Sequence, residues 1–347
     1  MRRRRFEDVL GEEVSRVRDS FRDTGSVSEK REEFRSGVLS TGSTLLDLAI
    51  SGKRIRGGGV PGGIIMEIYG PYASGKTAIL AEICASAQRN GGKVRFLDPE
   101  ARLDQEYARI YGVSLSEEDY YRPNTVSEAF ALIQDWEPGN SNTINVIATD
   151  SLAALSTEME LDKGDKMGMR RAKEFSEGFR KTARLIAKNN WIVACTNQVR
   201  EGEYGETTPG GFAIPFYSSL RIRVGQTGKI ERKTRISSGK EVSKVIGIES
   251  LCYIRKSTVD DPFREAPIWI VFGYGIDDVR GNLQWLKDME KSSVYVAPDG
   301  KGFQGMEQAI SHVEGNSLQE KLREQVISLW EEVEAKFVAD RKPKIRF

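Results

Sequence analysis

The chain has 347 residues, enough for one large α/β core with one or two small appendages. Its 52 basic and 51 acidic residues nearly cancel, so any affinity for nucleic acid must come from a local basic patch. No apolar run approaches the roughly 18 residues of a membrane span. The three cysteines, Cys84, Cys195 and Cys252, lie far apart in apolar runs, which favours buried free thiols over disulfides. We therefore expect a cytoplasmic protein with no membrane contact.

The first segment, residues 1–36, is predicted to stand apart from the core. Apolar side chains recur at spacings of three and four over residues 6–22, which predicts an amphipathic helix. The Ser-, Arg- and Glu-rich residues 23–36 read as a linker. The helix could fold back on its own core or dock on a neighbouring subunit, and the pattern alone favours neither.

Residues 70–77, GPYASGKT, match the phosphate-binding loop G-x-x-x-x-G-K-[ST]. The loop lies between an apolar strand-like run, residues 64–69, and a helical run that begins at Ala78. In that context backbone N–H groups and the positive end of a helix dipole point at phosphate oxygens. Lys76 can then reach the β- and γ-phosphates, and the Thr77 hydroxyl can bind Mg²⁺. The predicted nucleotide-binding residues are Gly70, Pro71, Tyr72, Ala73, Ser74, Gly75, Lys76, Thr77 and Ala78.

Strand-like and helical segments alternate after this loop. Strands are expected at residues 94–97, 144–149 and 191–196, and helices at 126–136 and 169–189. Such alternation predicts a parallel sheet covered by helices on both faces, with the ligand at the carboxyl ends of the strands.

Three polar side chains fall at those strand ends. Asp150 closes an apolar strand, as expected of the carboxylate that holds magnesium, and it can cap the next helix as well. Glu100 could orient and activate a water for γ-phosphate cleavage, or it could be a solvated loop charge. Gln198 is an uncharged group that could touch the γ-phosphate, which alone is a weak signal.

The pattern changes over residues 217–275. Strand-like runs separated by turns predict antiparallel strands that extend the sheet. Helical periodicity returns after residue 278, notably at 318–338, and predicts a small C-terminal domain over residues 278–347.

Taken together, these stretches resemble the bacterial RecA recombinase family. The resemblance rests on LSTGSTLLDLAI from Leu39, EIYGPYASGKT from Glu67, FLDPEARLDQEYARIYGV from Phe96, IATDSLAAL from Ile147, TNQVR from Thr196, TTPGGFAIPFYSSLRIRV from Thr207 and FGYGI from Phe272. It covers residues 37–277 clearly and the two ends more weakly. It implies an α/β fold with a RecA-type P-loop ATPase core, a mostly parallel central sheet flanked by helices, an N-terminal oligomerisation helix and a small C-terminal α/β domain.

The resemblance also implies roles for individual residues. Glu100 is the expected catalytic glutamate, and Asp104 and Tyr107 are expected to contact adenine. Gln198 is expected to sense the γ-phosphate and relay it to the DNA-binding loops. Lys256 is expected to reach the ATP that is bound to the neighbouring subunit, where Lys76 of that subunit's phosphate loop contacts the same ATP.

Two loops of the family hold single-stranded DNA. The first matches residues 159–169 here, and the second matches residues 199–215. Backbone and hydroxyl donors would contact phosphates there, and arginines would supply charge. An ordinary solvated helix face is the competing interpretation of the first basic cluster. The predicted DNA-binding residues are Arg170, Arg171, Lys173, Arg180, Arg200, Tyr204, Thr207, Thr208, Gly210 and Gly211.

The chain departs from the family pattern in places. Thr258 occupies the position of a second lysine that reaches the neighbour's ATP, and the second DNA loop is shorter. Leu251 and Tyr253 stand where the family has basic residues of a second DNA site. A long basic hairpin, carrying Lys229, Arg232, Lys233, Arg235, Lys240 and Lys244, is a hypothetical replacement for that site.

The resemblance implies a DNA-dependent ATPase that uses ATP and Mg²⁺. It is expected to form helical homo-oligomeric filaments on single-stranded DNA and to promote pairing and strand exchange with duplex DNA. The alternative is a RecA-fold accessory or regulatory DNA-binding ATPase without strand exchange, which the altered second DNA site favours.

Overall fold

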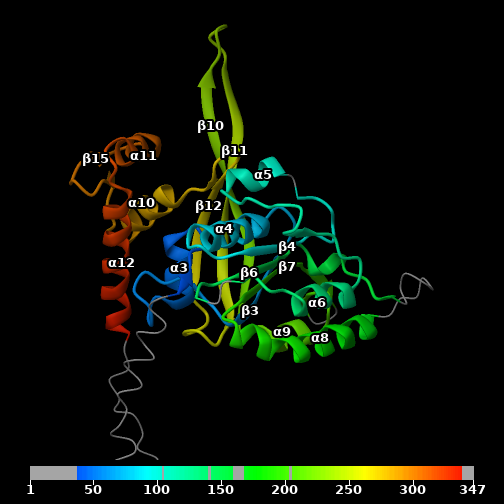
Figure 1. Ribbon diagram of the computed structural model, residues 1–347. Helices are drawn as coiled ribbons and strands as arrows, with labels where there is room; N and C mark the ends of the chain where they lie inside the picture. Colours follow the sequence, from blue (N-terminus) through cyan, green and yellow to red (C-terminus); the bar gives the residue numbers. More distant parts are fainter. Residues whose placement is uncertain (1–36, 104, 140–141, 159–167, 203–204, 338–347) are drawn as a thin grey trace, which may run out of the picture.

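The computed structural model describes residues 37–103, 105–139, 142–158, 168–202 and 205–337. Figure 1 shows a central twisted sheet with helices packed on both faces and a long hairpin that projects beyond them. The helix predicted over residues 6–22 lies outside the described residues.

The main sheet of the described chain has nine strands in the order β13-β12-β11-β10-β3-β7-β6-β4-β5. The strands β10, β3, β7, β6, β4 and β5 run parallel to their neighbours, and β10 to β13 pair antiparallel. The predictions of a mostly parallel sheet and of its antiparallel extension are both confirmed. The bounds are β3 Ile64–Gly70, β4 Val94–Leu97, β5 Tyr120–Tyr121, β6 Val146–Thr149, β7 Ile192–Gln198, β10 Leu220–Arg235, β11 Glu241–Ser257, β12 Glu265–Val271 and β13 Gly275–Ile276.

Side chains of the parallel strands alternate between two buried clusters, as expected for a sheet covered on both faces. In β3, Met66 and Ile68 face one cluster and Ile65 faces the other. Helices α3 and α4 cover the first face, and α6, α8 and α9 cover the second (Figure 1). The bounds are α3 Thr44–Ser51, α4 Lys76–Arg89, α5 Gln105–Ile110, α6 Val126–Gln134, α8 Gly168–Lys188 and α9 Ala213–Tyr217, with a 3-10 turn at Leu152–Ala154.

Some boundaries differ from the expectation; strand β6, predicted from residue 144, begins at Val146. Strand β7, predicted to end at Thr196, continues through Gln198 because it stays paired with Tyr69 and Gly70 of β3. Helix α6, predicted to reach Trp136, ends at Gln134, where Asp135 caps it.

The C-terminal segment packs on the core through α12. Leu322 and Val326 of α12 belong to the same buried cluster as Leu46 of α3. The elements here are α10 Asp278–Met289, β14 Tyr295–Val296, β15 Gly302–Phe303, α11 Met306–Gly315 and α12 Gln319–Lys336. Two further small sheets pair β1 Val38–Leu39 with β2 Val60–Pro61, and β8 Arg200–Gly202 with β9 Gly205–Thr207.

The three cysteines are buried and free, as predicted. Burial raises the pKa of the Cys195 thiol to about 12, so it stays protonated at neutral pH. No helix of the described chain has both the length and the apolar character needed to cross a membrane.

Candidate nucleotide and DNA site

The phosphate loop joins the carboxyl end of β3 to the first turn of α4, and its backbone requires glycine at two points. A Cβ on Gly70 would lie 2.0 Å from the Val224 carbonyl oxygen. Gly75 has φ +95°, and a Cβ there would lie 2.3 Å from Cδ1 of Ile270. Neighbouring strands therefore press directly on the loop and hold its curve.

The amino end of α4 presents its N–H groups without a side-chain cap, because the residue in the capping position is Gly75. The Lys76 ammonium donates to the carbonyl oxygens of Gly70 and Pro71 at 3.0 and 2.5 Å. Burial lowers the pKa of Lys76, while Asp150 and Glu100 raise it. Uncapped N–H groups and a buried ammonium at one helix amino end form an anion-binding cradle.

The oxygen atoms of Thr77 and Asp150 meet beside this cradle. The Thr77 hydroxyl donates to Oδ2 of Asp150 at 2.7 Å, and the Thr196 hydroxyl donates to Oδ1. Burial raises the pKa of Asp150, and these two hydrogen bonds lower it. A hydroxyl and a carboxylate oxygen are hard donors that fit Mg²⁺ with further ligands from water and phosphate. The residues present therefore fit a magnesium ion.

Glu100 lies beyond the end of β4, and its carboxylate is held on both sides. Ser151 donates to Oε1 at 2.6 Å, and Arg102 pairs with Oε2 at 2.9 Å. Because Ser151 directly follows Asp150, this hydrogen bond places the two carboxylates at neighbouring strand ends.

Gln198 is the last residue of β7, and it pairs with Gly70 at the start of the phosphate loop. Its side chain is exposed, and its backbone N–H donates to Oδ1 of Asn197 at 3.0 Å. The predicted residues Lys76, Thr77, Glu100, Asp150 and Gln198 thus lie at the carboxyl ends of four adjacent strands.

Behind the loop lies a buried polar network. Glu67 of β3 is fully buried and accepts from Nε of Arg221 at 2.6 Å and from Nδ2 of Asn197 at 2.9 Å. The Asn197 amide also donates to the carbonyl oxygen of Pro209 at 3.1 Å. The Asn197 side chain thereby connects the strand before the phosphate loop with the glycine turn of the predicted second DNA loop.

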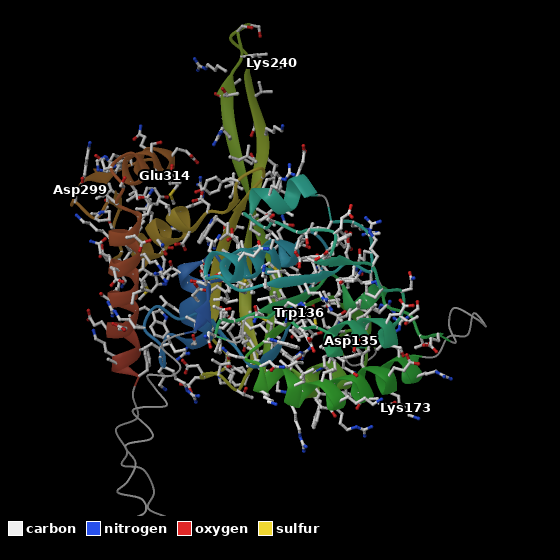
Figure 2. The ribbon with its side chains drawn as sticks, viewed as in Figure 1. Asp135, Trp136, Lys173, Lys240, Asp299 and Glu314 are labelled. Carbon is white, nitrogen blue, oxygen red and sulfur yellow. The ribbon has the colours of Figure 1, made fainter. Side chains whose placement is uncertain are left out.

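The basic residues predicted to bind DNA on the first loop lie along the start and middle of α8. Lys173 and Arg180 are exposed, while Phe175 and Phe179 are buried against the sheet. Arg170 is half-buried and pairs with Glu174 at 3.4 Å, and Arg171 is also partly buried. Figure 2 labels Lys173 on the outer surface of α8. Residues 159–167 lie outside the described chain.

The second loop forms a short hairpin in which Arg200 pairs with Thr207. Thr208 is half-buried, Gly210 is buried with φ +97°, and Gly211 is exposed with φ +62°. Tyr204 lies outside the described residues. Glu206 accepts from Nε and Nη2 of Arg223 at 2.7 and 2.5 Å, which ties this hairpin to β10.

The remaining predicted residues of the nucleotide site are Lys256, Tyr107 and Asp104. The Lys256 ammonium donates to the carbonyl oxygens of Pro215 and Phe216 at 2.8 and 2.9 Å, and burial lowers its pKa. Tyr107 belongs to α5, while Asp104 lies outside the described residues. Their predicted adenine contacts, and the contact of Lys256 with a neighbour's ATP, stay predictions.

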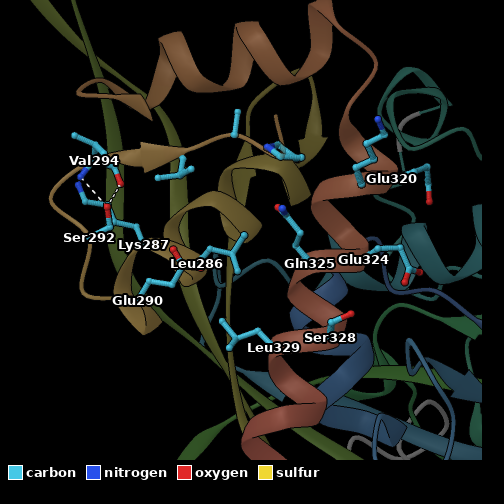
Figure 3. A pocket seen from close by; sticks show the side chains of 14 residues that line it. Leu286, Lys287, Glu290, Ser292, Val294, Glu320, Glu324, Gln325, Ser328 and Leu329 are labelled. Carbon is cyan, nitrogen blue, oxygen red and sulfur yellow. Dashed lines mark hydrogen bonds between the residues drawn. The ribbon is translucent and has the colours of Figure 1, made fainter. Parts of the chain in front are cut away.

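One pocket of about 670 Å³ lies elsewhere, between α10, β14 and α12. Figure 3 shows Gln325 and Leu329 of α12 on the side that faces Leu286 of α10. None of the predicted nucleotide or DNA residues lines this pocket.

The residues of the site geometry that were not predicted include Ser151, Thr196, Asn197 and Glu67. Each is adjacent or nearly adjacent in sequence to a predicted residue, since Ser151 follows Asp150 and Asn197 precedes Gln198. Ser151, Thr196 and Asn197 lie at or near strand ends, which is a signal in the sequence, whereas Glu67 lies in the middle of β3. Which atoms they contact depends on strand register.

Comparisons with known proteins agree with this arrangement. A family model described as the RecA N-terminal domain matches residues 10–277. A protein named RecA from Thermus thermophilus is 38% identical over 249 residues, covering 70% of this chain and 69% of its own. RecA of Deinococcus radiodurans is 34% identical over 303 residues, covering 84% and 79%, and RecA of Delftia acidovorans is 34% identical over 291 residues, covering 81% and 75%. The chain therefore belongs to the RecA family of DNA recombination and repair proteins.

Proposed function

We propose that this protein hydrolyses ATP with Mg²⁺ when bound to DNA, forms a helical filament on single-stranded DNA, and promotes pairing and strand exchange with a homologous duplex. The observation that carries the proposal is the convergence of Lys76, Thr77, Glu100, Asp150 and Gln198 at one edge of the sheet, in a chain of this family.

In the proposed nucleotide site, the phosphate loop and the first turn of α4 bind the phosphates. The Lys76 ammonium exchanges its carbonyl partners Gly70 and Pro71 for β- and γ-phosphate oxygens. Thr77 and Asp150 would hold Mg²⁺, which supplies positive charge against the charge that develops on the phosphates.

Glu100 is the proposed general base. A water attacks the γ-phosphorus, the bond to the β–γ bridging oxygen breaks, and the proton of the water passes to a Glu100 carboxylate oxygen. Ser151 and Arg102 fix the position of that carboxylate, one on each oxygen. Since phosphoryl transfer depends mainly on positioning and electrostatics, this fixation contributes to the hydrolysis rate.

The proposed connection between nucleotide and DNA runs through β7. Gln198 is paired with Gly70 on one side, and Asn197 holds Pro209 on the other. A movement of Gln198 toward a γ-phosphate would shift Asn197 and, with it, the Gly210–Gly211 turn. We propose that Arg200, Thr207 and Thr208, together with Arg170, Arg171, Lys173 and Arg180 of α8, contact the DNA backbone.

Assembly is proposed to complete the site. Lys256 of β11 is opposite Arg221 of β10, and Arg221 is opposite Glu67 of β3, three residues before the phosphate loop begins. Lys256 is therefore not part of the phosphate cradle of its own subunit. We propose that in a filament it leaves the carbonyls of Pro215 and Phe216 and reaches the ATP of the next subunit. Hydrolysis would then require neighbouring subunits.

The test is a strand-exchange assay with ATP and Mg²⁺, run beside electron microscopy of the protein on single-stranded DNA. Filaments with exchange are expected. Filaments without exchange would support an accessory DNA-binding ATPase, and hydrolysis that does not respond to DNA would contradict the proposal.

A further inference from the structure

The far half of the β10–β11 hairpin extends beyond the main sheet. Strand β10 pairs with β3 only over residues 220–223, and β11 pairs with β12 only over residues 247–253. All side chains from Glu231 to Lys244 are exposed. Figure 1 shows this part projecting past the helices, and Figure 2 places Lys240 at its tip. We call residues 229–244 the basic ribbon.

Packing within the protein does not account for the basic ribbon. A two-stranded hairpin without a buried face is marginally stable in water, and this one contributes no side chain to either buried cluster beyond Ile230. Its turn is held by hydrogen bonds from Ile236 N–H to the Lys240 carbonyl at 3.0 Å and from Gly239 N–H to the Ile236 carbonyl at 2.8 Å. A long, exposed and ordered extension of this kind indicates a binding element.

The charge of the ribbon is strongly positive in a chain that is otherwise nearly neutral. It carries six basic side chains and two acidic ones, Glu231 and Glu241. The two glutamates are not on the same face as Arg232 and Lys244, because neighbouring residues of a strand point to opposite faces. By the same alternation Lys233 and Arg235 share the face of the two glutamates, which offset them, so the uncompensated positive charge lies on the face of Arg232 and Lys244.

Arg232 and Lys244 are directly opposite each other in the strand pairing. Side chains in this position lie about 5 Å apart at Cβ, and like charges there are destabilising. Among the residues that the structure describes, the carboxylate that pairs with them is that of Glu307 on α11, at 4.0 Å from Arg232. Glu307 forms a shorter ion pair with Arg280, at 2.6 Å. Two cations kept face to face on an exposed ribbon favour an external anion as the partner.

We propose that the basic ribbon binds the phosphate backbone of duplex DNA, at a site separate from the DNA-binding loops. The major groove of B-form DNA admits a two-stranded β-ribbon, and a span of seven residues such as 229–235 extends roughly 20 Å. Figure 2 shows that Lys240 at the tip and Lys173 on α8 lie at opposite ends of the molecule, so one surface does not serve both.

The test compares the full-length wild type with the variant Arg232→Gln/Lys244→Gln by fluorescence anisotropy on a labelled duplex, over a series of salt concentrations. Each lost phosphate contact reduces the slope of log affinity against log salt by about 0.9, so the pair should reduce it by about 2 and weaken binding at least about tenfold near ~0.1 M salt. The matched control Lys291→Gln/Lys321→Gln removes two exposed lysines elsewhere and should leave both quantities unchanged.

A melting curve separates binding from folding, because removal of the like-charge pair should leave the melting temperature unchanged or raise it. The proposal is overturned if the wild type does not bind duplex, or if the ribbon variant keeps wild-type affinity and slope. It is also overturned if that variant keeps duplex binding but loses self-association in sedimentation, which would assign the ribbon to a contact between copies. Hydrolysis stimulated by single-stranded DNA in the wild type tests the proposed function independently.

Discussion

The substitution Glu67→Gln should both destabilise the protein and disturb its coupling to DNA. Glu67 is fully buried, and the Arg221 side chain that pairs with it is only 16% exposed. Gln keeps the size of the side chain but removes its charge, which leaves a buried guanidinium without a counter-ion. Removal of one partner of a buried ion pair costs about 3–5 kcal/mol.

Gln can still accept one hydrogen bond, and Arg221 stays over the ring of Tyr69 at 4.5 Å, so we expect the lower end, about 3 kcal/mol. For a large domain this corresponds to a loss of about 6–12 °C in melting temperature. Equilibrium urea unfolding and thermal melting measure both.

The matched control is Glu206→Gln, which removes the charge of another Glu–Arg pair on the neighbouring surface. Its side chains, Arg223 and Glu206, are 34% and 40% exposed. Water screens such a pair, and its loss should cost less than about 1 kcal/mol. Equal losses for the two variants, or a loss below about 1 kcal/mol for Glu67→Gln, would refute the argument that burial makes the first pair important.

Three further predictions concern the nucleotide site and its surroundings. Lys76→Ala removes the one ammonium in the phosphate cradle, so it should abolish both hydrolysis and stable filaments, measured by phosphate release and electron microscopy; normal filaments would contradict it. Ser151→Ala removes the hydrogen bond to one carboxylate oxygen of Glu100. It should lower the hydrolysis rate about tenfold or more with little change in ATP affinity. A loss of ATP affinity without a loss of rate would show that Ser151 does not position Glu100. Burial raises the pKa of Asp47 from 3.8 to about 6, and the nearby Asp278 adds to the rise, so between these pH values the folded protein holds a proton that the unfolded chain has already lost. This carboxyl therefore weakens the fold as pH rises through that window, and the stability of Asp47→Asn relative to wild type should improve by about 1 kcal/mol from pH 5 to 7 in urea titrations; no change with pH would contradict the shift.

The local parts of the site were predictable from sequence, and the contacts between distant parts were not. The phosphate loop was recognisable because its strand, glycine turn and helix are contiguous, and Gly70, Lys76 and Thr77 act within eight residues. Asp150 and Glu100 were recognisable as strand-end carboxylates. Their hydrogen bonds with Thr196 and Ser151 depend on strand order and register, which the chain sets through the whole sheet.

The second DNA loop shows the same limit. Its glycines and threonines were predictable as backbone and hydroxyl donors, but its short β8–β9 pairing was not, because the segment is short and without apolar alternation. The hydrogen bond from Asn197 to Pro209 joins residues that are close in sequence. The same Asn197 amide also donates to Glu67, 130 positions away, and that contact links the loop to the strand before the phosphate loop. Long-range polar contacts of this kind leave no periodic signal.

The most direct test of the account is Glu100→Gln in the full-length protein, measured for ATP hydrolysis and for ATP-dependent binding to single-stranded DNA. Gln keeps the hydrogen bond from Ser151 but cannot accept the proton of the attacking water. The account predicts that hydrolysis falls at least about a hundredfold, while filaments on DNA form with ATP and persist longer than those of the wild type. Hydrolysis at the wild-type rate, or loss of DNA binding equal to that of Lys76→Ala, would contradict it.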